Sequence, residues 1–236
     1  MNKGFEFRVS NLSPAWNLEL GTEFGMKGNL IIITSPSGGG KGTLIREVLL
    51  SVADIGYSIS YTTRPKRVGE QDGREYFFIS PAEFEHRSAE DEFLESAEVH
   101  GNLYGTSKAT VQEIIESGRD VILEIDVQGA KIVLEKMPDA VSIFIMPPSF
   151  EVLRARLTAR ATERYDDLNL RLRNSFTEVR EYQHFQYVIV NQELFKAAAD
   201  LKTVILAERL RRVRQTVAIC DILNNFDVSK LSKIGE

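Results

Sequence analysis

Apolar residues gather in short continuous runs along this chain, and stretches with helical spacing follow them. Four runs predict strands buried on both faces, at 30–34, 121–127, 141–146 and 187–190. Amphipathic stretches at about 41–51, 107–117, 128–137, 150–160, 166–182 and 192–220 predict helices. Strands that alternate with helices are typical of an α/β fold with a doubly wound parallel sheet. Ligands of such a fold bind beyond the carboxyl ends of the strands.

Residues 57–106 follow a different pattern. Short apolar runs at 58–61, 74–79, 93–99 and 103–106 are separated by turns at Gly69, Asp72-Gly73 and Gly101-Asn102. They predict a small β-rich lobe, with a short helix near 81–88, inserted into the larger sheet domain.

The pattern divides the chain into four parts. The core domain comprises 27–57 and 107–222 and includes a charged, helical lid at about 156–171, and the inserted lobe comprises 58–106. Residues 1–26 form an N-terminal extension that is either disordered or lies upstream of a natural start at Met26. The polar tail, 223–236, is expected to fray. The last helix is expected to pack on the core through Leu201, Val204, Ile205, Leu210, Val213 and Val217.

A glycine-rich turn and one lysine connect the first predicted strand to a helix. This segment reads Ser35, Pro36, Ser37, Gly38, Gly39, Gly40, Lys41, Gly42 and Thr43. Backbone N–H groups of such a turn can surround phosphate oxygens, and the lysine adds a positive charge near the β- and γ-phosphates. The segment therefore predicts a binding site for a nucleoside triphosphate, although a flexible turn with an incidental lysine would give part of the same pattern.

The segment departs from the usual phosphate-loop pattern at two positions. Ser35 stands where the pattern has its first glycine, and Gly42 stands where a hydroxyl normally contacts magnesium. Either Thr43 contributes, or phosphates and water hold the Mg²⁺ that accompanies ATP. No protein ligand of the metal is therefore assigned.

Composition narrows the class of protein further. The chain of 236 residues has 29 Lys and Arg against 34 Asp and Glu, a net charge of −5, which argues against a nucleic-acid partner. The single cysteine, Cys220, suits a reducing compartment, and no apolar run approaches the length needed to span a membrane. We therefore expect a cytoplasmic enzyme without a membrane partner.

The inserted lobe begins with a basic segment that can bind phosphate. Arg64 and Arg67 can present two guanidinium groups to one phosphate, and Glu70 can hold one of them in place. Tyr76 and Tyr104 can donate hydrogen bonds to the same group. Taken alone, such a basic run is more often a solvated surface loop.

Several motifs in order resemble guanylate kinases. They are Ser60-x-Thr62-Thr63-Arg64-x-x-Arg67-x-Gly69-Glu70-x-x-Gly73-x-x-Tyr76, then Phe93-Leu94-Glu95, then Gly101-Asn102-Leu103-Tyr104-Gly105-Thr106, then Ile122-Leu123-Glu124-Ile125-Asp126-Val127-Gln128-Gly129. The resemblance covers about residues 28–210. It implies transfer of the γ-phosphoryl group of ATP to GMP, and also to dGMP, giving ADP and the diphosphate.

The resemblance also implies roles for individual residues. Ser60, Glu95, Thr106 and Asp126 would surround guanine, while Arg64, Arg67, Tyr76 and Tyr104 would bind the GMP phosphate with Glu70 positioning the arginines. Lys41 and the lid arginines Arg156, Arg160 and Arg171 would stabilise the transferred group. Two positions depart from the family: Thr106 is more often serine, and Glu124 is often aspartate, so contacts near the metal can differ.

Guanine recognition also follows from hydrogen-bonding chemistry. Guanine offers an N1–H and an exocyclic amine as neighbouring donors, and a carboxylate such as Glu95 can accept from both. Adenine has an acceptor at N1, which would face the carboxylate without a proton between them. A site of this kind rejects the wrong base strongly.

Two other functions stay open at this point. Guanylate-kinase-like domains can serve as non-catalytic peptide binders, although the intact Gly40-Lys41 and the paired arginines argue against that role here. A kinase for another monophosphate is the second alternative, because the Lys41-Gly42-Thr43 ending also resembles adenylate kinases. The sequence leaves the oligomeric state open, a homo-oligomer included.

Overall fold

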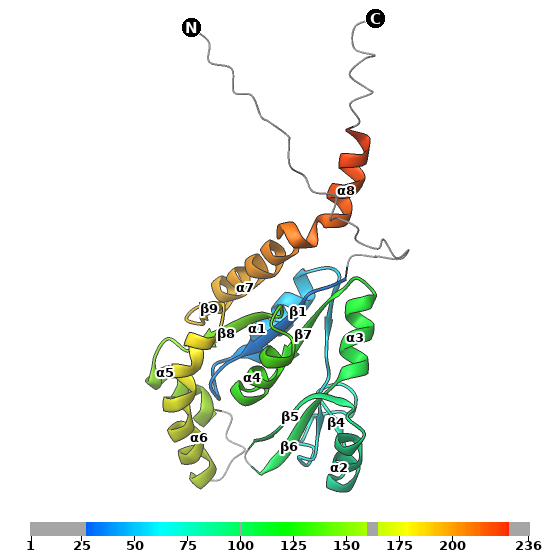
Figure 1. The fold of residues 1–236 in the computed structure, drawn as a ribbon. Coiled ribbons are helices and arrows are strands. Elements are labelled where there is room, and N and C mark those ends of the chain that lie inside the picture. Colours follow the sequence, from blue (N-terminus) through cyan, green and yellow to red (C-terminus); the bar gives the residue numbers. More distant parts are fainter. Residues whose placement is uncertain (1–26, 100, 160–164, 227–236) are drawn as a thin grey trace, which may run out of the picture.

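The computed structural model describes residues 27–99, 101–159 and 165–226. Two sheets organise these residues (Figure 1). The larger is a five-stranded parallel sheet in the order β2-β7-β1-β8-β9, and the smaller has four strands in the order β4-β3-β6-β5. The α/β class with a parallel sheet is therefore confirmed.

The strands of the large sheet agree with the apolar runs in three of four cases. These three are β1 (Leu30–Thr34), β8 (Val141–Met146) and β9 (Tyr187–Val190). The fourth, β7, runs over Asp120–Glu124 and is shorter than the predicted 121–127. It ends early because the Asp126 side chain accepts a hydrogen bond from the Gly129 N–H and caps the next helix.

The sequence missed the fifth strand of this sheet, β2 (Ile55–Tyr57). Three residues at a sheet edge are too few to show a period, and the predicted strand was placed at 58–61 instead. Among the described residues of that region, the only strand is β3 (Tyr61–Thr62), and it belongs to the small sheet. The chain therefore crosses from one sheet to the other between Tyr57 and Tyr61.

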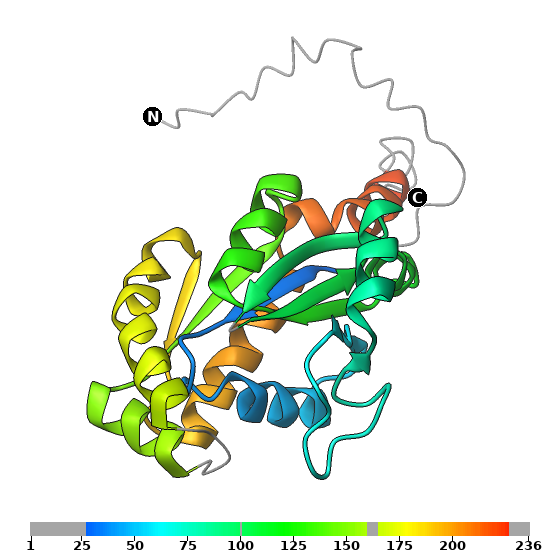
Figure 2. The ribbon, with the colours of Figure 1, turned by 90° about the horizontal axis from the view of Figure 1, so that it is seen from below.

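Helices cover both faces of the large sheet (Figure 2). On one face, α1 (Lys41–Ser51) and α7 (Leu194–Arg209) bury apolar side chains against alternate residues of β1. On the other, α3 (Lys108–Glu116) and α4 (Val127–Lys136) pack on the remaining residues of that strand. Because both faces are buried, the first four residues of β1 are all apolar instead of alternating with polar ones.

The small sheet combines short strands with one long hairpin. The hairpin is β5 (Phe93–Val99) with β6 (Asn102–Ser107), joined by a turn that includes Gly101 at φ +75°. The predicted strand at 74–79 shrinks to β4 (Phe77–Phe78), because side-chain and backbone hydrogen bonds hold the preceding residues in turns. The lobe also carries α2, Pro81–Ala89, capped by the Ser80 hydroxyl.

The chain after β8 forms two further helices near the glycine loop. They are α5 (Phe150–Ala159) and α6 (Tyr165–Glu178), and a 3₁₀ segment, η1 (Val179–His184), leads on to β9. The lid predicted at about 156–171 spans the end of α5 and the start of α6, and its residues 160–164, Arg160 included, lie outside the described residues.

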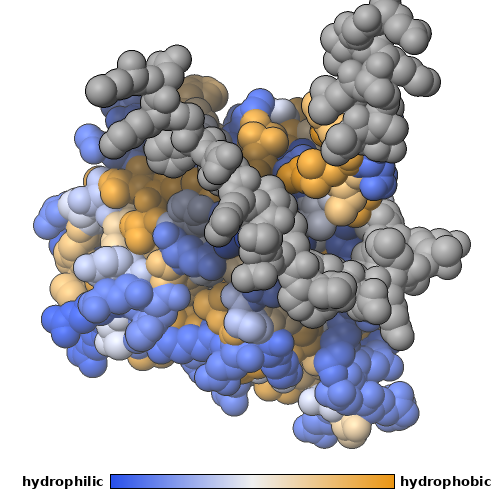
Figure 3. All heavy atoms as spheres, turned by 45° about the horizontal axis from the view of Figure 1, so that its top comes forward, coloured by the Kyte–Doolittle hydropathy of each residue, from blue (hydrophilic) through white to orange (hydrophobic). Residues whose placement is uncertain are grey.

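The prediction of one packed C-terminal helix over 192–220 was wrong. The helix breaks after α7 into a 3₁₀ turn, η2 (Arg212–Arg214), and α8 (Thr216–Asn225), which extends away from the large sheet (Figure 1). Leu201 and Ile205 are buried as expected, but Leu210, Val213 and Val217 are exposed. All three follow Arg209, the last residue of α7. Figure 3 shows that apolar side chains also gather elsewhere on the surface of the molecule.

The tail predicted to fray from residue 223 remains helical to Asn225, and 227–236 and the extension 1–26 lie outside the described residues. Among the described helices, none combines the length and apolarity required to cross a bilayer.

Candidate functional site

The glycine-rich turn leads from the end of β1 directly into α1. Gly38 and Gly40 adopt φ values of +85° and +89°, a backbone region that side chains with a Cβ rarely enter. No side chain caps the N-terminus of α1, and its first turn holds no acidic residue. The first N–H groups of α1 can therefore donate to an anion.

Two side chains hold the turn from behind. The Arg156 guanidinium donates to the Gly39 carbonyl at 3.2 Å and to the Asn191 carbonyl at 2.9 Å, and the Asn191 amide donates to Gly39 at 2.9 Å. Partial burial lowers the pKa of Arg156. The sequence predicted that Arg156 contacts the phosphates, whereas its hydrogen bonds here are to backbone carbonyls. No sequence pattern marked Asn191, which follows β9 and belongs to no motif.

A second missed residue also contacts the loop. The Glu178 carboxylate, at the end of α6, accepts a hydrogen bond from the Ser37 N–H at 3.1 Å. A carboxylate at this position shows that the loop backbone binds negatively charged oxygen. No sequence pattern marks Glu178 out from the other acids of its helix.

A cavity of about 310 Å³ extends from this turn to the small sheet. It brings together most of the predicted site residues from both sheets. The lining includes Ser35, Pro36, Ser37, Gly38, Gly40, Lys41, Gly42, Ser60, Arg64, Arg67, Glu70, Tyr76, Glu95, Tyr104, Glu124, Asp126, Arg171 and Glu178. Gly39, Thr43, Thr106 and Arg156 do not line it.

The phosphate-binding arginines expected in the lobe are ordered by one carboxylate. Arg64 donates to both oxygens of Glu70, at 2.8 and 3.0 Å, and the Arg67 N–H donates to Glu70 at 2.8 Å. Although partial burial opposes it, these hydrogen bonds lower the pKa of Glu70. The Arg64 guanidinium also lies 5.4 Å from the centre of the Tyr76 ring.

The Tyr76 and Tyr104 rings meet edge to face across the same part of the cavity, 5.8 Å apart. Burial, and next the nearby Glu124 charge, raise the pKa of Tyr76 to about 12. Its phenol therefore stays protonated and able to donate a hydrogen bond.

The Glu95 carboxyl is the most deeply buried acid of the cavity. It lies on β5 opposite Thr106 on β6, and the Thr106 hydroxyl donates to it at 2.6 Å. The pKa of Glu95 is raised to about 7, chiefly by burial; the Thr106 hydrogen bond opposes this rise, and the nearby charge of Asp126 adds to it. A Cβ at Gly129 would come within 2.7 Å of the second Glu95 oxygen, so any larger residue there would displace this carboxyl.

A further carboxylate, Glu124, ends β7 beside the glycine-rich turn. Oε1 lies 4.0 Å from the Lys41 ammonium, and Oε2 accepts a hydrogen bond from the Tyr57 hydroxyl at 3.2 Å. Tyr57 ends the neighbouring strand, β2, and its pKa is strongly raised by burial and then by Glu124. Sequence reasoning missed Tyr57 because it carried no motif.

Comparison with known proteins identifies this arrangement. A sequence model described as guanylate kinase matches residues 27–208, most of the chain. The chain belongs to the guanylate kinase family.

Curated guanylate kinases are similar over nearly their whole length. The protein of Symbiobacterium thermophilum is 50% identical over 197 residues, which cover 84% of this chain and 93% of that protein. The protein of Dechloromonas aromatica is 49% identical over 185 residues, covering 78% and 92%. The crystal structure of guanylate kinase from Anaplasma phagocytophilum superposes with a TM-score of 0.68 at 32% identity, covering 80% of this chain and 90% of that one.

The oxygen atoms near the glycine-rich turn suit a magnesium ion that is bound together with ATP. Among the described residues, no three His, Cys, Asp or Glu side chains converge on one point, so they form no all-protein cage. One carboxylate, Glu124, lies next to Lys41, and Mg²⁺ typically combines one or two carboxylates with phosphates and waters. Glu124 therefore fits an ion that arrives with the nucleotide.

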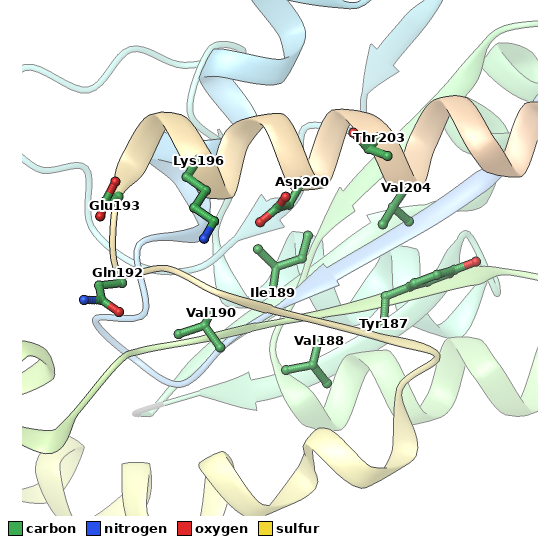
Figure 4. Close-up of a pocket in the computed structure, with 10 residues that line it drawn as sticks. All are labelled: Tyr187, Val188, Ile189, Val190, Gln192, Glu193, Lys196, Asp200, Thr203 and Val204. Atoms are coloured by element: carbon green, nitrogen blue, oxygen red, sulfur yellow. The ribbon is translucent and has the colours of Figure 1, made fainter.

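Another hollow, of about 450 Å³, lies on the far edge of the large sheet between β9 and α7 (Figure 4). It is lined by residues such as Val188, Val190, Lys196 and Asp200 and by none of the predicted site residues. No residue of the glycine-rich turn lines this hollow, and neither do Arg64 and Arg67. The candidate site of this guanylate kinase family member is therefore the cavity at the turn.

Proposed function

We propose that this chain transfers the γ-phosphoryl group of ATP to GMP, giving ADP and GDP in purine nucleotide metabolism. One observation carries the proposal: a single cavity joins a phosphate-binding turn to a buried carboxyl and an ordered arginine. Donor and acceptor phosphates can then meet in one enclosed space, as direct transfer requires.

The acceptor half of the cavity suits guanine. Glu95, once ionised, accepts from guanine N1–H and the exocyclic amine, while Ser60 and Asp126 offer further polar contacts. Thr106 acts from behind by holding one oxygen of Glu95. None of these contacts needs the ribose 2′-hydroxyl, so dGMP is an acceptor as well.

The GMP phosphate would lie against Arg64, Arg67, Tyr76 and Tyr104. Arg64 is already oriented by Glu70, so little side-chain entropy is lost when phosphate binds. These groups would hold the attacking phosphate oxygen in line with the donor.

The donor triphosphate would lie along the turn, from Ser35 to Thr43, with Lys41 near the β- and γ-phosphates. Arg171 lines the cavity and would act on the transferred group, as would Arg160 from the lid, which lies outside the described residues. Arg156 would act by fixing the turn through Gly39.

Phosphoryl transfer asks little covalent chemistry of the protein. The transition state is loose and its charge is spread over the equatorial oxygens, so positioning and positive charge supply most of the rate enhancement. Bound Mg²⁺ would neutralise phosphate charge, and Glu124 is the described residue placed to hold it. Lys41 and the arginines complete the neutralisation.

The surroundings of the enzyme follow from its substrates and composition. ATP and GMP are cytoplasmic metabolites, and one cysteine in 236 residues suits that compartment. We therefore place the protein in the cytoplasm, without a nucleic-acid or membrane partner, as a monomer or a homo-oligomer.

A coupled assay of ADP release, run with and without GMP, tests the proposal. ADP should form only when GMP is present, and Lys41→Met should lower kcat by orders of magnitude with GMP binding unchanged. Lys196→Met, on α7 in the separate hollow, is the matched control and should keep wild-type turnover. No GMP-dependent ADP from the wild-type chain would indicate a binding module instead.

A further inference from the structure

The strand that carries Glu95 contains a β-bulge directly before this residue. Phe93 of β5 pairs with Ser107 of β6, and the next pair is Glu95 with Thr106. Leu94 is therefore an extra residue of β5 that has no opposite residue on β6. A bulge bends its strand and redirects the side chains beside it, so the direction of Glu95 depends on the backbone at Leu94.

Three consecutive side chains of β5 are buried in three different places. Phe93 stacks on Phe84 within the lobe, and Leu94 packs in the core on one face of the large sheet. Glu95 lies in the cavity. A regular strand offers only two faces, so the bulge accounts for the third direction. It lets the strand join the lobe to the core and still aim Glu95 into the cavity.

The carbonyl of the bulge residue accepts a hydrogen bond from a lysine of another element. Lys136, the last residue of α4, donates from its ammonium group to the Leu94 carbonyl at 2.6 Å, across 42 positions of the chain. This carbonyl belongs to the peptide group that leads into Glu95. Because the donor is charged, the bond is stronger than one between neutral groups. Lys136 therefore fixes the backbone where the direction of Glu95 is set.

The same helix also surrounds the Glu95 carboxyl with its other end. A Cβ on Gly129 would lie 2.7 Å from Glu95 Oε2, and Asp126 caps the start of the helix. Burial is the main cause of the raised pKa of Glu95; of the two charged groups that act on it, Asp126 raises this pKa and Lys136 lowers it. The charge of Lys136 thus favours the ionised carboxyl, the form that accepts from guanine.

We propose that Lys136 is a positioning residue for guanine recognition, which holds the bulge at Leu94 so that the Glu95 carboxyl faces the base. The inference rests on the proposed function, because it takes GMP as the ligand. A cation in the last turn of a helix can also serve the helix dipole alone. In that case its removal would leave the binding of GMP unchanged.

Calorimetry of GMP binding and, separately, of ADP binding at pH 8 tests the inference without turnover. Lys136→Met should raise the Kd for GMP about 10-fold, because a small displacement of a binding group weakens its contacts strongly, and should leave the Kd for ADP unchanged. Lys131→Met is the matched control, since it removes the same charge from the same helix and its partner is Glu181. It should keep both constants.

Two further measurements distinguish positioning from a general loss of structure. The pH midpoint of GMP affinity should move to higher pH in Lys136→Met, because Glu95 loses a charge that lowers its pKa. Inosine monophosphate offers N1–H without the exocyclic amine, so the ratio of its Kd to that of GMP reports the contact with both donors. This ratio should fall in Lys136→Met.

Two other replacements of the lysine complete the design. Lys136→Arg keeps a charged donor and should restore both the pH midpoint and the ratio. Lys136→Gln removes the charge with a polar side chain and should move the midpoint in the same direction as Lys136→Met, which keeps the test decisive if the methionine variant does not fold. The position is exposed, and thermal unfolding shows whether each variant is folded.

Two results would overturn the inference. One is a wild-type Kd for GMP, with unchanged midpoint and ratio, in a folded variant that lacks the charge. The other is a loss of ADP affinity as large as the loss of GMP affinity. Both leave the proposed function intact, because the wild-type chain still binds GMP. Failure of the wild-type chain to bind GMP would instead refute the acceptor site, and the inference with it.

Discussion

Replacement of Glu95 by glutamine should stabilise the protein while destroying its preference for guanine. Glu95 is 3% exposed, and burial is the largest cause of its raised pKa. The amide keeps the size of the side chain and its ability to accept from Thr106, but it carries no charge. The substitution therefore removes the cost of ionising a buried group and little else.

The size and sign of this effect follow from proton linkage. The pKa of Glu95 rises from 4.5 to about 7 on folding. A raised pKa means that the protonated form is favoured in the folded state, so stability is fully present below pH 4.5 and is lost as the pH rises to about 7. At about 1.4 kcal/mol per pKa unit, the loss accumulated between pH 5 and pH 8 is about 2 to 3 kcal/mol.

Urea unfolding of wild type and Glu95→Gln at pH 5 and pH 8 measures this loss. The difference in unfolding free energy between the two proteins should shift in favour of the variant by about 2 to 3 kcal/mol on going to pH 8. Glu98→Gln, exposed on the same strand, is the control and should show no such shift. A Glu95→Gln difference that is equal at both pH values would refute the reasoning.

The same ionisation controls substrate binding. Guanine donates two protons at this position, so it binds the ionised carboxyl, and GMP affinity should fall as the pH drops below about 7. At pH 8, Glu95→Gln should bind GMP far more weakly than the wild type does, because its amide faces a guanine donor with one of its own.

Two further predictions concern contacts that sequence motifs do not reveal. Gly129→Ala should raise the KM for GMP at least 10-fold with little change in the KM for ATP, because the new Cβ would lie 2.7 Å from Glu95 Oε2; steady-state kinetics with each substrate varied in turn checks this. Arg209→Met should lower the free energy of unfolding by about 1 to 3 kcal/mol without changing either KM, because the buried Asp120 carboxylate, 3% exposed, loses a charged partner at 2.7 Å. Urea unfolding at pH 7 measures this loss. Arg212→Met, at an exposed position, is the control.

Sequence patterns predicted the strands that are mostly apolar runs and the loop in which Gly38 and Gly40 adopt positive φ. They failed where structure depends on partners distant in the chain. The three-residue β2 is a strand only because β7 pairs with it, and α7 ends at Arg209, well before the predicted end of the helix. Apolar periodicity alone could not show that Leu210 and Val213 lie beyond that limit.

The residues of the candidate site also divide into those that a local motif reveals and those that depend on distant parts of the chain. Arg64 and Glu70, which one local motif contains, are in contact as expected, and only six positions of the chain separate them. Tyr57 and Asn191 carry no motif, and their contacts with Glu124 and Gly39 span 67 and 152 positions. Only the order of strands in the sheet brings Tyr57 to Glu124 and Asn191 to Gly39.

The central claim is that one cavity selects guanine and passes it a phosphoryl group from ATP. Incubation of the protein with ATP and an equimolar mixture of GMP, AMP, CMP and UMP, followed by chromatography of the products at early times, tests it most directly. The account predicts ADP and GDP in equal amounts, with CDP and UDP absent and no ADP in excess of GDP. Formation of CDP or UDP at a rate similar to that of GDP, or of ADP well in excess of GDP, would contradict it.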